Sequence, residues 1–319
     1  MKAAIVRSAG QTPVYADFPE PVSAADEQRV TVTAAAISHL VKGRAAGTHY
    51  SASGQFPFVV GIDGVGRLDD GGRVYFVLPR APNGSMAERT VVPVSQCLLL
   101  PDDLDDVTAA AIANPGMSSW AAFTERARLK AGETVLVNGA TGTAGRLAVQ
   151  IARYMGAGKV IATGRNLDTL QAVAALGADV TIPLAQDDAA LAERLQKQFT
   201  EGVDVVIDYL WGKSAEALLI AGARAGADAV PIRFVQVGAA SGSDITLPGA
   251  VLRSSAIELM GSGMGSIALE GLVGAVGGLL RATVSGGFQI ATTPVPLSDV
   301  ERAWRRDDST RRTVFIMNS

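Results

Sequence analysis

Cysteine and histidine are scarce in this sequence, so a catalytic zinc site would have to rely largely on carboxylates. Its 319 residues include a single cysteine, Cys97, and two histidines, His39 and His49. One cysteine excludes an internal disulfide, and this set cannot supply a structural zinc site of four cysteines. We therefore expect no metal ion. We expect Cys97, in the strand-like stretch VSQCLLL, to be a small buried residue.

Charged residues and long apolar runs are also scarce. Charged residues make up 18% of the chain, the net charge is −3, and no basic patch or long run of one sign occurs. This pattern is untypical of proteins that bind nucleic acids or membrane surfaces. The apolar segment 267–280 is interrupted by Glu270 and falls short of the about 20 residues that span a bilayer, which predicts a core helix. The first ten residues lack the apolar core of a signal peptide, which predicts a cytoplasmic enzyme.

Strand and helix patterns divide the chain into two parts, and its length also favours two domains. The first hundred or so residues are β-rich, with runs such as KAAIV, RVTVTAAAI and RVYFVL separated by Gly, Pro and Asp. An amphipathic helix is expected over residues 118–128. Six strand-like runs with helical spacers then follow: TVLVN, KVIATG, DVTIP, VDVVIDY, IRFVQVG and AIELMG. This alternation predicts an α/β fold with a doubly wound parallel sheet.

The stretch TVLVNGATGTAG, residues 134–145, has the pattern of a dinucleotide-binding strand, turn and helix. Gly142 would let the backbone approach a pyrophosphate, and Gly145 would let the helix pack tightly on the strand. Ala140 replaces the first glycine of the commoner GxGxxG motif. An ordinary strand, turn and helix without a ligand is the alternative. The expected contacts with the cofactor are Gly139, Thr141, Gly142, Thr143, Ala144 and Gly145.

The end of the second strand indicates which dinucleotide binds. An NAD-selective site would have an Asp or Glu there to bind the ribose 2′-hydroxyl, whereas this chain has Gly164, Arg165 and Asn166. No carboxylate repels a 2′-phosphate, and Arg165 offers donors suited to binding one. These residues predict NADPH as the cofactor. The alternative for Arg165 is a solvated surface arginine.

Ligands of doubly wound sheets bind beyond the carboxyl ends of the strands. This rule places the stretches 208–212 and 237–240 beside the cofactor, where Gly238 would permit a close approach. The expected contacts are Tyr209, Leu210, Val237, Gly238 and Ala239. The alternative for Tyr209 and Trp211 is packing within the loop.

The stretches PGMSSWAAF, LKAGETVLVNGATGTAG, GVDVVIDYLWG, FVQVGAASG and LMGSGMGS together cover much of the chain. In this order, after a β-rich N-terminal part, they resemble the medium-chain dehydrogenase/reductases, specifically their zinc-free quinone oxidoreductase (ζ-crystallin-like) branch. The resemblance implies a β-rich GroES-like catalytic domain from residues 1–114 and 266–319, and a Rossmann domain from residues 115–265. It also implies hydride transfer from NADPH to a quinone or an α,β-unsaturated carbonyl compound. A homodimer formed through the strand at 257–260 is implied as well.

The resemblance also implies a set of catalytic residues. Ser38 and Ile62 stand where zinc-dependent relatives have two metal ligands, and Ser38 stands where the quinone branch usually has Asn. Ser38 would hydrogen-bond near the nicotinamide. Gly47-Thr48-His49 fits the family's G-x-Y element, so His49 or Tyr50 would assist protonation of an enone. The alternative for His49 is a surface loop histidine.

Further cofactor contacts are implied near both ends of the Rossmann domain and in the last strand. Ser118 matches a threonine that lies against the nicotinamide in the family, and it could also be a helix-terminal serine that satisfies backbone amides. Arg312 replaces the lysine of the family's G-K-x-V element. The full additional set is Asn114, Ser118, Gly263, Met264 and Arg312.

Two other functions are compatible with these residues. An NADPH-binding redox sensor, or a structural protein with little catalysis, would keep the dinucleotide motif without needing the metal ligands. A zinc alcohol dehydrogenase is disfavoured by Ser38 and Ile62. The sequence does not identify the compound that accepts the hydride.

Overall fold

The computed structural model describes residues 1–48, 54–306 and 311–317, and the chain divides into two compact units. Unit 1 comprises Met1–Asn114 and Val276–Ser319, and unit 2 comprises Pro115–Ala275. Each unit has a hydrophobic core of its own.

Unit 1 is built from two sheets. The larger, seven-stranded sheet has the order β15-β16-β3-β5-β6-β8, with β7 also paired to β3, and the smaller has the order β2-β1-β4. Neighbouring strands are antiparallel except for β15 and β16, which are parallel. The strands are β1 (Lys2–Val6), β2 (Val14–Asp17), β3 (Glu27–Ala36), β4 (Phe58–Val59), β5 (Asp63–Leu68), β6 (Arg73–Val77), β7 (Arg89–Pro93), β8 (Cys97–Leu99), β15 (Thr292–Pro296) and β16 (Arg312–Ile316).

Helix α1 (His39–Ala46) follows β3 directly. The Ser38 Oγ caps it by accepting a hydrogen bond from the Val41 amide, 3.1 Å away. The helix ends at Gly47, whose φ of +73° is a left-handed conformation that favours glycine. Short helical segments, η1 (Val94–Gln96), η3 (Leu297–Asp299) and α9 (Val300–Ala303), connect or flank other strands of the unit.

Unit 2 contains a six-stranded sheet with the order β11-β10-β9-β12-β13-β14. All neighbouring strands are parallel. Its strands are β9 (Thr134–Asn138), β10 (Lys159–Gly164), β11 (Val180–Pro183), β12 (Val205–Asp208), β13 (Ile232–Gln236) and β14 (Ile257–Gly261). These are the six strands that the sequence predicts, and their order confirms the doubly wound fold.

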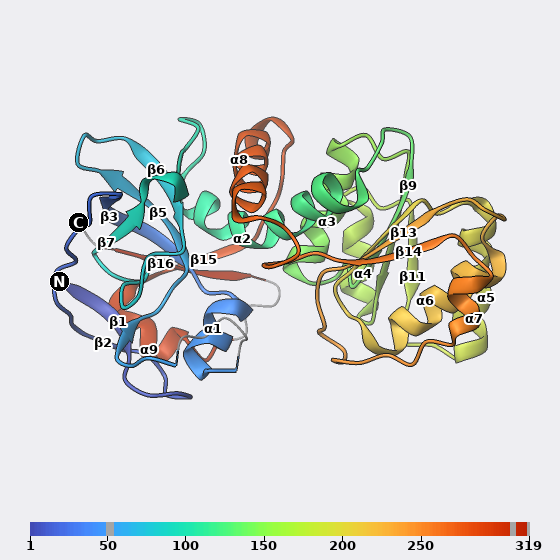
Figure 1. Cartoon of the computed structure of the whole chain (residues 1–319), viewed down its shortest axis with the longest axis horizontal. Helices are drawn as coiled ribbons and strands as arrows, with labels where there is room; N and C mark the ends of the chain where they lie inside the picture. The colour runs from blue at the N-terminus through green and yellow to red at the C-terminus, as the bar shows by residue number, and fades with distance from the viewer. Residues whose placement is uncertain (49–53, 307–310, 318–319) are drawn as a thin grey trace. The chain divides into compact units, whose positions relative to one another are not determined.

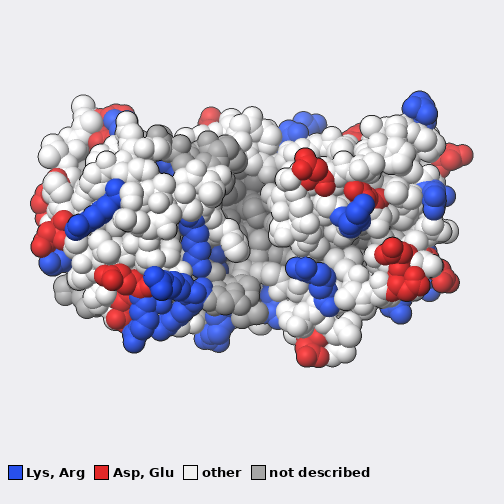
Figure 2. Space-filling model, turned by 90° about the horizontal axis from the view of Figure 1, so that it is seen from below, with Lys and Arg blue, Asp and Glu red and all other residues white. Residues whose placement is uncertain are grey.

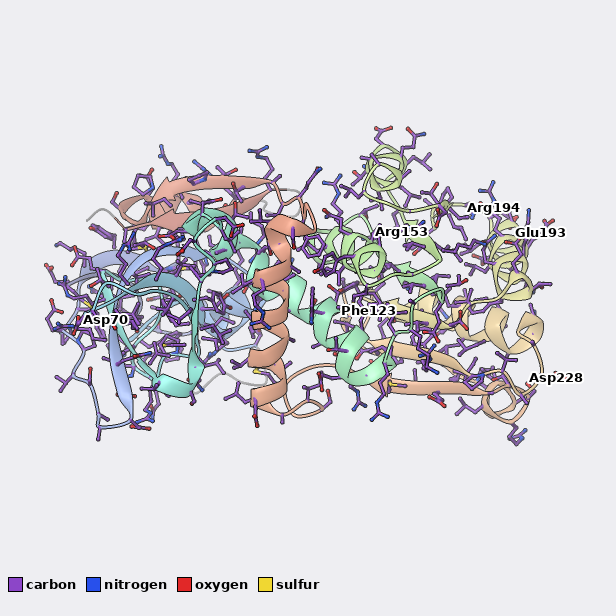
Figure 3. The ribbon with its side chains drawn as sticks, turned by 90° about the horizontal axis from the view of Figure 1, so that it is seen from above. Asp70, Phe123, Arg153, Glu193, Arg194 and Asp228 are labelled. Carbon is purple, nitrogen blue, oxygen red and sulfur yellow. The ribbon has the colours of Figure 1, made fainter. Side chains whose placement is uncertain are left out.

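Helices cover both faces of this sheet (Figure 1). Figure 1 shows α3 (Thr143–Tyr154) and α4 (Leu167–Ala174) on one face, and α5 (Asp188–Glu201), α6 (Gly212–Ala225) and α7 (Gly249–Arg253) on the other. Arg153, which is labelled in Figure 3, lies on α3. It donates a 2.6 Å hydrogen bond to the Gly177 carbonyl and forms an ion pair with Asp179 before β11. The strand order reverses between β9 and β12, and a ligand crevice is expected at this reversal.

The helix that leads into unit 2 differs from the prediction. Helix α2 runs over Asp106–Ala121 and continues as a π-helical segment, Ala122–Ala127, instead of starting at Ser118. Its first half includes a run of buried alanines and Ile112. Because this run is apolar on all sides, the sequence shows no alternation of polar and apolar residues with the period of a helix. Pro115 lies inside the helix, although proline usually marks a boundary. Helix α8 (Leu269–Ser285) overlaps the predicted core helix at 267–280.

The surface of unit 2 carries charges of both signs. On the face drawn in Figure 2, acidic and basic side chains are interspersed over this unit instead of forming a single patch. Among the helices of the described residues, none has the length and hydropathy needed to span a bilayer.

Candidate dinucleotide site

The glycine turn after β9 has the geometry that its residues predict. Gly139 adopts a φ of +89°, and a Cβ at Gly145 would lie 2.3 Å from the Gly139 carbonyl oxygen, so only glycine allows α3 to approach the strand. A Cβ at Gly142 would meet nothing within 4 Å, which leaves open space in front of the turn. No side chain caps α3 at Gly142. The N-terminus of α3 therefore has the geometry of an anion-binding site.

The end of β10 lies against this turn. A Cβ at Gly164 would lie 2.3 Å from the Thr141 methyl group. Arg165 follows with an exposed side chain, and no described carboxylate forms an ion pair with it. Asn166 caps α4, because its Oδ1 accepts a 2.8 Å hydrogen bond from the Thr169 amide. The structure thus brings the predicted residues of the turn and of the β10 end together.

The loop after β12 packs against the glycine turn. A Cβ at Gly139 would lie 2.8 Å from Leu210 Cγ, so the Leu210 side chain packs directly on the turn. A Cβ at Gly238, after β13, would lie 2.7 Å from the Tyr209 carbonyl oxygen. Val237 and Gly238 both donate their amides to the Asp208 carbonyl, at 2.8 and 3.1 Å. The loops after β12 and β13, including Ala239, therefore lie close together at the carboxyl edge.

Ser118 and Tyr209 lie together in unit 2. Their hydroxyl oxygens are 3.3 Å apart, and the Ser118 hydroxyl also donates a 2.7 Å hydrogen bond to the Pro115 carbonyl. Burial raises the pKa of Tyr209 to about 12, so its hydroxyl keeps its proton at neutral pH. Ser118 lies within α2, and the alternative of a helix-terminal serine is wrong because the helix begins at Asp106.

Gly263 and Met264 follow β14. The Gly263 amide donates a 2.8 Å hydrogen bond to Ser266 Oγ. Met264 is partly buried and packs against a small hydrophobic cluster of unit 2 that includes Ala121 and Ile267. Asn114 lies half-buried in α2, at the last position of unit 1. The roles predicted for these residues remain predictions.

A buried polar group that was not predicted from the sequence lies beneath the turn. Thr163, Asn138 and Asp208 lie at or near the ends of three neighbouring strands, and all three are 0% exposed. Each is a polar residue near the carboxyl end of an apolar run, which is the only signal the sequence offers. Their contacts depend on the strand order, which brings residues far apart in the chain into register.

Unit 1 has its own buried polar group. The Tyr75 hydroxyl donates a 2.8 Å hydrogen bond to Asp63 Oδ2, and both residues are buried. Burial raises the pKa of Asp63 to about 6, despite the hydrogen bond from Tyr75 and the charge of Arg312, which both lower it. Arg312 is 6% exposed in β16. Its charge therefore acts on Asp63, and contact of Arg312 with a cofactor remains a prediction.

The positions that bind zinc in relatives carry no obvious ligands here. Ile62 is 4% exposed in the hydrophobic core of unit 1, and Ser38 is buried as the cap of α1. The described residues contain no group of three or more His, Cys, Asp or Glu side chains placed to hold a metal ion. Cys97 is half-buried instead of fully buried as expected, and this partial burial raises the pKa of its thiol. His49 and Tyr50 lie outside the described residues.

Comparisons with known proteins agree with this architecture. A family model described as zinc-binding dehydrogenase matches residues 144–275, a range that includes neither Ser38 nor Ile62. A probable NADPH-dependent quinone reductase of Emericella nidulans is 30% identical, and the match covers 99% of this chain and 100% of that protein.

Solved structures give the same result. The quinone oxidoreductase from Thermus thermophilus, also solved as a complex with NADPH, is 27% identical with a TM-score of 0.80, covering 99% of this chain and 100% of that one. A probable oxidoreductase from Mycobacterium abscessus is 27% identical with a TM-score of 0.79, covering 99% of both chains. With its doubly wound unit, its glycine turn and these full-length similarities, this chain belongs to the quinone oxidoreductase branch of the medium-chain dehydrogenase/reductase superfamily.

Proposed function

We propose that this protein is an NADPH-dependent oxidoreductase that transfers hydride to a quinone or an α,β-unsaturated carbonyl compound without zinc. The observation that carries the proposal is the glycine turn beside a β10 end that has Arg165 and no carboxylate. The names of the relatives from E. nidulans and T. thermophilus support the same activity.

The geometry of unit 2 fits a dinucleotide phosphate. The open space at Gly142 and the N-terminus of α3, where the N-cap Gly142 has no side chain, suit the pyrophosphate. The exposed guanidinium of Arg165 suits the 2′-phosphate because it can donate two parallel hydrogen bonds to phosphate oxygens. Ser118 and Tyr209 present neighbouring hydroxyls that we assign to the nicotinamide half.

When bound, NADPH supplies the hydride, and the protein orients the reactants and manages protons. Direct hydride transfer to a quinone requires no dedicated side-chain acid. Reduction of an enone needs a proton after the hydride has reached the β-carbon, and we assign this step to His49 or Tyr50. Ser38 retains its hydroxyl proton as a donor, because its oxygen accepts the cap hydrogen bond from α1.

Zinc independence is supported by unit 1. The core position of Ile62 offers no ligand atom, and Ser38 offers only a hydroxyl that already caps α1. Zinc sites in proteins use Cys, His, Asp or Glu side chains.

We also propose a cytoplasmic homodimer. Strand β14 is the edge of the six-stranded sheet, with Leu259 40% exposed, and such an edge can pair with a second copy. A single cysteine is compatible with a reducing compartment.

The proposal is tested by following NADPH oxidation with a panel of quinones and enones, with NADH as the comparison. We expect turnover with at least one acceptor class and a preference for NADPH. Tight NADPH binding without turnover across the panel would instead indicate a redox sensor or a structural protein. Oxidation of simple alcohols that requires zinc would indicate a zinc alcohol dehydrogenase.

A further inference from the structure

Three polar side chains form a buried row across the sheet of unit 2. Thr163 on β10 lies opposite Asn138 on β9, and Asn138 lies opposite Asp208 on β12. Their neighbours in these strands are mostly Val, Ile, Leu and Ala, all fully buried. Polar groups in such surroundings are costly unless they are hydrogen-bonded, and here they bond to one another and to the backbone. We call Thr163, Asn138 and Asp208 the polar ladder.

The β10 end of the polar ladder holds the glycine turn. The Thr163 hydroxyl donates a 2.6 Å hydrogen bond to Asn138 Oδ1. The same hydroxyl oxygen of Thr163 accepts a 3.2 Å hydrogen bond from the amide of Gly139, the first residue of the turn. A side chain of β10 therefore holds the backbone that follows β9.

The β12 end holds the following loop. Asp208 Oδ1 accepts hydrogen bonds from Asn138 Nδ2 at 2.8 Å and from the Leu210 amide at 2.9 Å. The Trp211 amide donates to both carboxylate oxygens, at 3.1 Å. Trp211 has a φ of +58° and a ψ of −156°, a conformation that costs a non-glycine residue about 1–3 kcal/mol and persists only where its surroundings hold it.

The two held segments touch each other. Leu210 packs on Gly139 so closely that a Cβ there would lie 2.8 Å from Leu210 Cγ. Asn138 connects the two ends, and its Nδ2 also donates a 2.9 Å hydrogen bond to Ser214 Oγ in the first turn of α6. The turn and the loop are thus joined both by direct packing and by one chain of hydrogen bonds.

We propose that Thr163, Asn138 and Asp208 are positioning residues that couple the glycine turn to the loop after β12 and so preset both for the dinucleotide. This inference rests on the proposed function, because it assigns the ladder to NADPH binding. At its β10 end the ladder contacts the turn assigned to the pyrophosphate and not the hydroxyls assigned to the nicotinamide half. Thr163 therefore sets the affinity for NADPH and not the rate of hydride transfer.

The test uses a matched pair at one position. Thr163→Val keeps the shape of the side chain and removes the hydroxyl, whereas Thr163→Ser keeps the hydroxyl and removes the methyl group. We expect Thr163→Val to raise the NADPH dissociation constant about tenfold with kcat changed less than about twofold, since the lost hydroxyl leaves the turn less well ordered. Thr163→Ser is expected to bind NADPH as the wild type does.

Binding of 2′-AMP distinguishes a local effect of Thr163→Val on the glycine turn from a general disturbance of the binding site. This probe carries the 2′-phosphate assigned to Arg165 and lacks the pyrophosphate assigned to the turn. We expect its affinity to be equal in the wild type and in Thr163→Val. Equal NADPH affinity in both proteins, or an equal loss for NADPH and 2′-AMP, would overturn the inference. Absence of NADPH binding in the wild type would instead overturn the proposed function.

A double variant tests whether the ends of the ladder act as one unit. Asp208→Asn replaces one of the two carboxylate oxygens that accept from the Trp211 amide with an NH₂ group, which cannot accept. If the ends are coupled through Asn138, the loss of NADPH affinity in Thr163→Val/Asp208→Asn is smaller than the product of the single losses. Multiplicative losses would show independent sites and contradict the coupling. If Asp208→Asn does not fold, the pair at Thr163 decides the question.

Discussion

Gly145 lies so close to Gly139 that a Cβ on Gly145 would be 2.3 Å from the Gly139 carbonyl oxygen. This contact brings the start of α3 onto the turn after β9. Gly142, between them in the chain, has open space where its Cβ would be. Gly142 and Gly145 therefore serve different purposes, and an alanine substitution at each position distinguishes these purposes.

Gly145→Ala is expected to destabilise the protein, and Gly142→Ala is expected to weaken cofactor binding. The added methyl at Gly145 meets backbone that cannot move freely, which costs about 1–3 kcal/mol in overpacking. The methyl at Gly142 fits the free protein, whose φ of −77° suits alanine, but occupies the space assigned to pyrophosphate. Thermal unfolding and an NADPH titration of both variants measure the two effects. Unchanged NADPH affinity in Gly142→Ala would contradict the assignment of the phosphate to this turn.

Arg165→Glu is expected to raise the KM for NADPH about tenfold or more and to leave the KM for NADH nearly unchanged. A charged hydrogen bond to phosphate contributes about 1.5–3 kcal/mol, and the new carboxylate would repel the 2′-phosphate. Steady-state kinetics with both cofactors measure the change. Arg194→Glu is the matched control, because Arg194 lies on α5 at the surface (Figure 3). A similar effect of both variants would show that net charge alone is responsible.

Asp63→Asn is expected to reduce the pH dependence of stability between about pH 4 and pH 6. Burial raises the pKa of Asp63 from an ordinary 3.8 to about 6, so in this window the folded protein holds a proton that the unfolded chain has lost. The free energy of unfolding therefore falls as the pH rises, by up to about 3 kcal/mol from this group. The asparagine of the variant does not titrate, and its amide oxygen can still accept from Tyr75. The free energy of unfolding of the wild type and of Asp63→Asn, measured by chemical unfolding at about pH 4 and pH 6, checks this prediction. The same change with pH in both proteins would contradict it.

Treatment with a strong chelator is expected to leave turnover unchanged. Ser38 and Ile62 stand at the positions of two zinc ligands in zinc-dependent relatives, and both side chains are buried in unit 1. Activity and metal content would be measured before and after chelation. Loss of activity that added zinc restores would contradict zinc independence.

The sheet of unit 2 was predictable from the sequence, because its strands are short β-branched runs separated by helical spacers. The turn was predictable as well, since Gly139 and Gly145 have local steric reasons to be glycine. The start of α2 was missed, because residues buried on all sides show no amphipathic period.

Long-range side-chain contacts were not predictable from the sequence. Thr163, Asn138 and Asp208 meet only because β10, β9 and β12 are neighbours in register. Arg312 was matched to a local motif, yet its charge acts on Asp63, far away in the chain. Such contacts depend on the completed fold and leave little trace in local patterns.

NADPH dependence without zinc is tested by the ratio of kcat/KM for NADPH to that for NADH, measured with a quinone acceptor on chelator-treated protein. We predict turnover without metal and a ratio of about ten or more, because Arg165 binds the 2′-phosphate that only NADPH carries. A ratio near one, or no turnover until zinc is added, would contradict it.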